Sequence, residues 1–117
     1  MERVLGPEQP YTLSARANLA HWTGQAGDAA GARDQFAALL PAAMRVLGPD
    51  HPATLTVRAN LAGFTGQAGD AAGARDQYAA LLPDRERLSG PDHPDTLAAR
   101  ANLAHFTGQA EQDNRSR

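Results

Sequence analysis

The chain contains no cysteine, no lysine and no long apolar run. Without cysteine, disulfide bridges and thiolate metal sites are excluded. No apolar run approaches the roughly 20 residues of a membrane span, and no signal peptide opens the sequence, so we expect a soluble, cytoplasmic protein without a membrane partner. The 11 basic residues, all arginine, are interspersed with 13 acidic residues and leave a net charge of −2. Because no concentrated basic surface results, we expect no nucleic-acid partner.

Aromatic residues are also scarce, at 5% of the chain, whereas apolar residues reach 42% and most of them are alanine. We therefore expect a thin core in which helices approach closely around leucine, alanine and a few rings. The 117 residues are enough for one modest domain.

What the chain does have is a repeat. Gly6-Pro7 recurs as Gly48-Pro49 and as Gly90-Pro91, 42 residues apart each time, and residues 96–110 repeat 12–26 with two changes. Such a period indicates a solenoid, in which each unit buries its apolar face against its neighbours. Residues 12–40 and 54–82 differ at only five of 29 positions, which are Ser14/Thr56, Ala15/Val57, His21/Gly63, Trp22/Phe64 and Phe36/Tyr78.

The first half of each copy predicts a helix. Gly48 suits the left-handed position that follows a helix. Asp50 or His51 can cap the next helix, with Pro52 in its first turn, where a missing N–H costs nothing. An apolar stripe at helical spacing then predicts a helix over about 53–64.

The second half predicts another helix, antiparallel to the first. Glycines within 65–69 end the first helix, and Asp70 is a good cap for the second. Pro83 lies inside the second apolar pattern, so we expect a kink there and at Pro41 in the first copy.

These elements predict an all-α solenoid of five main helices, about two and a half repeats, in one domain over 1–117. We expect a helical stub at 2–5 and a frayed polar tail. The predicted units are repeat one at about 6–47, repeat two at about 48–89, a C-terminal half repeat or cap helix at about 90–110, and the tail at 111–117.

The repeated residues resemble a known family. Each first helix carries Asn-Leu-Ala, an alanine follows that leucine thirteen residues later, and an aromatic ring follows four residues after the alanine (Leu19, Ala32 and Phe36; Leu61, Ala74 and Tyr78). This pattern resembles the tetratricopeptide repeat. The period and the Gly-Pro-Asp-His-Pro linker look like its kinesin-light-chain type, which is common in actinobacterial proteins, often beside a nucleotide-binding ATPase module. The resemblance covers residues 2–110.

This resemblance implies a right-handed superhelix whose first helices line a concave groove, and a scaffold that binds a peptide or protein segment in that groove. In several members, an asparagine before the helix leucine hydrogen-bonds the main chain of an extended peptide. Asn18, Asn60 and Asn102 match that position, and an amide both donates and accepts. The opposing interpretation is a structural or inherited polar position, since close copies preserve every residue.

Two further sets of residues are candidate peptide contacts. Arginines precede each asparagine by two residues. They contact an acidic partner, pair with helix acids such as Asp34 or Asp76, or are simply solvated. Histidines follow two of the asparagines by three residues, on nearly the same face. Because each repeat carries at most one histidine at an equivalent position, these side chains do not converge on one point, and we expect no metal site. The full sets are Arg16, Arg58 and Arg100, and His21 and His105.

Catalysis has no support in the sequence. No nucleophile accompanies a histidine and an acid in a local motif, and the Gly-Gln-Ala-Gly-Asp segments follow no strand, so they form no phosphate loop. We expect no enzyme activity, no metal and no cofactor.

Other functions stay open. The first helix lacks a full preceding partner, so a surface near Tyr11 and Trp22 is expected to be exposed and to favour a homodimer or a longer array. Trp22, Phe64 and Phe106 otherwise suit packing between repeats. The near-identical copies also fit a designed repeat protein without an evolved ligand, and the family resemblance fits a regulatory part of a larger nucleotide-dependent enzyme.

Overall fold

The computed structural model describes residues 9–116, and this part of the chain is helical without strands. The predicted stub at 2–5 lies outside the described residues. The predicted all-α architecture is confirmed, with five helices: α1 (Pro10–Gln25), α2 (Ala29–Val46), α3 (Pro52–Gln67), α4 (Ala71–Ser89) and α5 (Pro94–Arg115).

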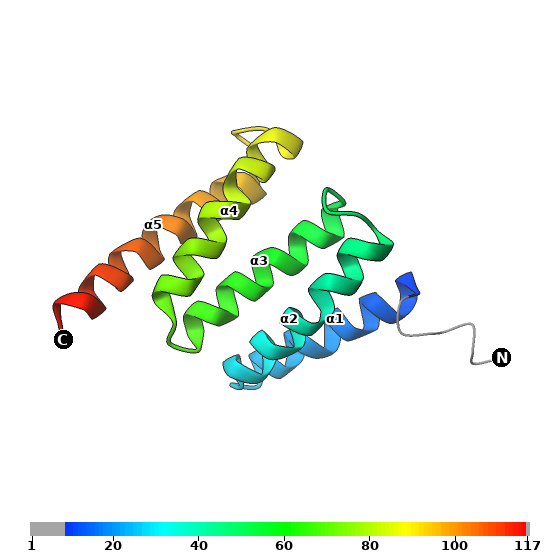
Figure 1. Ribbon diagram of the computed structural model, residues 1–117, viewed down its shortest axis with the longest axis horizontal. Helices are drawn as coiled ribbons and strands as arrows, with labels where there is room; N and C mark the ends of the chain where they lie inside the picture. The colour runs from blue at the N-terminus through cyan, green and yellow to red at the C-terminus, as the bar shows by residue number, and fades with distance from the viewer. Residues whose placement is uncertain (1–8, 117) are drawn as a thin grey trace.

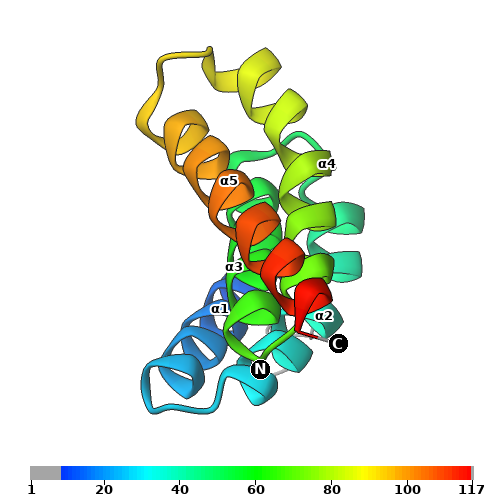
Figure 2. The same cartoon turned by 90° about the vertical axis from the view of Figure 1, so that its left-hand side faces the viewer.

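The helices form two layers. Figure 1 shows each helix running beside the next in chain order, from α1 at one end of the elongated molecule to α5 at the other. In the view of Figure 2, α1, α3 and α5 lie on one side, and α2 and α4 lie on the other. The first helices of the repeats therefore make one surface of the solenoid, and the second helices make the other.

The turns form as the sequence predicts. The helices α1 to α4 are each followed by a glycine at positive φ, between 95° and 106°, a region that glycine enters without steric cost. Asp28 and Asp70 cap α2 and α4, each accepting a hydrogen bond from a main-chain N–H at 2.8 Å. His51 and His93 cap α3 and α5 through Nδ1 at 3.0 Å. Both α2 and α4 continue through their internal prolines as single helices.

The core consists of two clusters, one for each junction between successive repeats. At the first, the rings of Phe36 and Phe64 stack with centroids 5.9 Å apart, and at the second Tyr78 and Phe106 stack at 6.0 Å. Phe64 and Phe106 are only 5% and 9% exposed, whereas Trp22, their counterpart in the first copy, is 65% exposed. Packing between repeats is thus confirmed for the two phenylalanines, and so is exposure of the α1 surface at Trp22.

The predicted frayed tail is wrong over residues 111–115, which continue α5. Glu111 stands where Gly27 and Gly69 end the equivalent helices, so the third copy lacks the terminating glycine. Ala110 is buried in the second core cluster and holds the end of the helix against its neighbours. Across residues 9–116, no helix combines the length and apolar character that crossing a bilayer would require.

Candidate functional site

A hollow of about 320 Å³ lies on the surface made by α1, α3 and α5. These are the first helices, or A helices, of the repeats, and we call this hollow the A-helix groove. Its walls are polar and come from all three first helices. The rings of Tyr78, Phe64 and Phe106 also line it. The wall residues are His21 and Gln25 from α1, Asn60, Gly63 and Gln67 from α3, and Asn102 from α5.

One lining position of the groove differs between the copies. Gly63 stands where the first and third copies carry a histidine, so it adds no side chain to the lining. A Cβ at Gly63 would lie 3.2 Å from the hydroxyl of Tyr78, and that hydroxyl donates to the carbonyl of Ala59 at 3.4 Å. In the first copy the equivalent residues are His21 and Phe36, and phenylalanine has no hydroxyl. The smaller residue at position 63 thus accompanies the added hydroxyl of Tyr78.

The asparagines occupy unequal positions. Asn60 and Asn102 are half-buried and border the groove, whereas Asn18 is exposed and lies outside it. None of the three side-chain amides has a hydrogen-bond partner among the described residues. Asn60 and Asn102 therefore present free donors and acceptors at one hollow.

The two histidines are separated. His21 lines the A-helix groove, and its ring meets Trp22 edge-on at 5.3 Å. His105 lies beside a neighbouring hollow between α3 and α5 and contacts Phe106 at 4.7 Å. Among the described residues, no three histidine, aspartate or glutamate side chains gather as metal ligands would.

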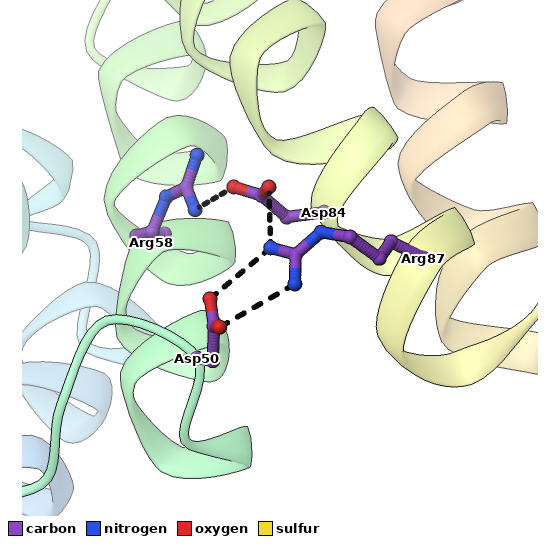
Figure 3. A network of polar contacts seen from close by, with 4 residues as sticks. All are labelled: Asp50, Arg58, Asp84 and Arg87. Atoms are coloured by element: carbon purple, nitrogen blue, oxygen red, sulfur yellow. Dashed lines mark hydrogen bonds and ion pairs between the residues drawn. The ribbon is translucent and has the colours of Figure 1, made fainter.

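Two of the three candidate arginines, Arg58 and Arg100, form ion pairs with residues of α4. Arg58 donates to Asp84 at 2.7 Å, and Arg87 bridges Asp84 and Asp50 at 3.0 and 3.1 Å (Figure 3). The bonds from Arg58 and then Arg87 lower the pKa of the Asp84 carboxyl. The bonds to Asp50 and then Asp84 raise the pKa of Arg87. Arg58 is thus neutralised inside a network that joins α3 to α4.

Arg58 and Arg100 pair with helix acids, as one interpretation predicts, but Asp34 and Asp76 are not the partners. Asp34 and Asp76 pair with their own sequence neighbours, Arg33 and Arg75, at 3.0 Å. Arg58 pairs with Asp84 instead, and Arg100 pairs with Glu86 at 2.9 Å. The reason is that the Arg58 and Arg100 side chains reach α4, while an acid beside an arginine on one helix finds its partner locally. Arg16 is half-buried and has no ion pair with another described residue.

Sequence reasoning missed the groove residues Tyr78, Gln25 and Gln67. The available signal was the paired exchange between copies that are otherwise nearly identical: histidine to glycine, and phenylalanine to tyrosine.

Comparison with known proteins agrees with this architecture. The family model described as the tetratricopeptide repeat matches residues 12–53 and 54–95, two consecutive segments with the period seen in the sequence. A search of curated proteins gives no significant match. Two matches in register over most of an all-helical chain leave one assignment: this chain belongs to the tetratricopeptide-repeat family.

Proposed function

We propose that this protein binds an extended segment of a partner protein in the A-helix groove. Tetratricopeptide repeats generally mediate protein–protein interaction, and solenoids use extended surfaces for it. One observation carries the proposal: Asn60 and Asn102, from different repeats, border a single hollow with their amides unpaired among the described residues. An extended main chain offers alternating N–H and C=O groups that such amides can bind.

The surrounding residues support a polar, uncharged binding surface. His21, Gln25 and Gln67 add donors and acceptors around the same hollow. Arg58 and Arg100 are engaged by acids of α4, so we assign them to packing of the repeats and not to the partner. His105 extends the surface toward α5 through the neighbouring hollow.

The test is selection of linear peptides from a random library, followed by affinity measurement on three variants. Asn60→Ala and Asn102→Ala should each weaken a selected peptide by about five- to thirtyfold, because each removes one or two hydrogen bonds of about 1 kcal/mol. Asn114→Ala removes an exposed amide of α5 outside the groove and is the control. Equal affinity of all three variants and the parent would exclude the amides as main-chain contacts.

A second function, self-association, is supported by the apolar surface of α1. Tyr11, Leu19 and Trp22 are 69%, 63% and 65% exposed, and exposed apolar surface of this kind favours association. Light scattering after size exclusion should then show a mass that rises with concentration. Trp22→Ser should lower that mass and Met44→Ser, at another exposed apolar residue, should not. A constant monomer mass for the parent would rule this function out.

A further inference from the structure

A second pocket lies on the same surface, and it is apolar. It has a volume of about 430 Å³ and lies where α1, α2 and α3 meet, within the usual range of about 300–1,000 Å³ for ligand pockets. None of its described lining residues is charged. Its lining includes Leu13, Leu39, Ala43, Leu47, Ala53 and Val57.

The equivalent place one repeat later is filled. There the hollow shrinks to about 90 Å³. Arg85 stands in place of Ala43 and Asp95 in place of Ala53. Arg85 is only 5% exposed, and its Nη1 lies 3.7 Å from the Asp95 carboxylate. A guanidinium and a carboxylate therefore occupy the volume that two alanines leave open in the preceding repeat.

This difference changes what each place can bind. Charged side chains are rejected by the open pocket, since burying an unpaired charge among apolar walls is costly. An aliphatic or aromatic side chain gains about 25 cal/mol for each Å² of apolar surface that it buries. At the filled place, an incoming apolar group would have to displace Arg85, whose Nε has no hydrogen-bond partner among the described residues.

The position of the pocket indicates the source of that side chain. Asn60 lines both the apolar pocket and the A-helix groove. An amide suited to a main chain thus stands directly beside a pocket suited to a side chain. Recognition of extended segments combines these two elements, with main-chain bonds for affinity and pockets for specificity.

We propose that the apolar pocket is the specificity site of the protein: it takes one branched aliphatic or aromatic side chain of the partner segment, whose main chain crosses Asn60. This inference rests on the proposed function, because it assumes that a polypeptide lies in the A-helix groove. The Ala43/Arg85 and Ala53/Asp95 exchanges restrict this anchor to the first of the two repeat junctions.

The test uses matched variants at equivalent positions. Thr56 and Ala98 are exposed, lie four residues before Asn60 and Asn102, and border the open and the filled place. Peptides selected on the parent protein are measured by fluorescence polarisation on Thr56→Phe and Ala98→Phe. We expect a recurring apolar residue in the peptides, a loss of about tenfold or more for Thr56→Phe, and a change below about twofold for Ala98→Phe.

A second measurement identifies the contact. Changing the recurring apolar residue of the peptide to alanine should weaken binding to the parent but not to Thr56→Phe, which is the non-additivity of groups in contact. The double variant Ala43→Arg/Ala53→Asp, which transplants the filled arrangement, should behave like Thr56→Phe. Circular dichroism of each variant checks its fold.

The outcomes separate the two proposals. If peptides bind and Asn60→Ala weakens them while Thr56→Phe and Ala98→Phe behave alike, the specificity pocket is overturned and groove binding stands. If peptides bind without a shared apolar residue, the pocket is likewise overturned. If no peptide is selected above background, both proposals fail.

Discussion

Alanine substitution at two equivalent glycines should change stability in opposite directions. Gly66 and Gly108 occupy the same position in α3 and α5, and the two residues on either side of each are identical. A Cβ at Gly66 would lie far inside van der Waals contact of the Phe106 ring, and that ring is already stacked on Tyr78. A Cβ at Gly108 would meet nothing within 4 Å.

The magnitudes follow from two opposing contributions. Replacing a helical glycine by alanine stabilises by about 0.8–1 kcal/mol, and overpacking a core costs about 1–3 kcal/mol. Gly108→Ala should therefore raise the free energy of unfolding by up to about 1 kcal/mol. Gly66→Ala should lower it by up to about 2 kcal/mol, because the overpacking cost outweighs the gain in helix propensity.

The assay is urea unfolding followed by far-UV circular dichroism. Gly24→Ala provides an internal control, because its Cβ would meet the Phe64 ring in the same way. It should shift the midpoint in the same direction as Gly66→Ala. If Gly66→Ala and Gly108→Ala shift the midpoint equally and in one direction, then ring-on-glycine packing does not hold the repeats together as described.

Three further changes test the rest of the structure. Asp84→Asn should lower the free energy of unfolding by about 0.5–1 kcal/mol at neutral pH. Because Arg58 lowers the pKa of Asp84, this contribution is present above the unfolded-state pKa and is lost as pH falls through the folded-state pKa. An acid unfolding profile that is the same for the variant and the parent would contradict this. Burial raises the pKa of Tyr78 above 10.0, so stability falls as pH rises from the unfolded-state pKa through the folded-state pKa. In the Tyr11→Phe variant, which keeps a single tyrosine, ultraviolet titration should show that this tyrosine ionises at a higher pH in the native state than in urea. Identical titration curves in the two states would refute the burial of Tyr78. Asp70→Ala removes the N-terminal cap of α4 and should lower the free energy of unfolding, measured by thermal denaturation, by about 1 kcal/mol. An unchanged stability would show that the 2.8 Å capping hydrogen bond does not stabilise the helix.

Much of the fold was predictable from local signals. Gly48, Asp70 and His51 specify turn and cap geometry through their own backbone and side-chain chemistry, and each acts where the sequence predicts. The helix over 111–115 was not predicted, because these residues are polar and lack an apolar period. The third copy carries Glu111 in place of the glycine that ends the equivalent helices, which allows the helix to continue. Comparison of the three copies shows this exchange of glycine for glutamate directly.

The candidate site was predictable only in part. The asparagine positions follow from the repeat, and the structure places Asn60 and Asn102 at one groove. The partner of Arg58 was not predictable, since Asp84 lies 26 residues away on another helix and reaches it only through packing. The pocket beside Asn60 likewise depends on how α1, α2 and α3 pack, since residues of all three helices line it.

Chemical-shift mapping of a selected peptide on the isotopically labelled protein tests the central claim most directly. Groove binding predicts perturbed amide signals around His21, Asn60, Gly63 and Asn102, on the three first helices, with little change on the outer surface of α2 and α4. Perturbation confined to α2 and α4, or to the α1 surface at Trp22, would contradict the account and place the binding surface elsewhere on the solenoid.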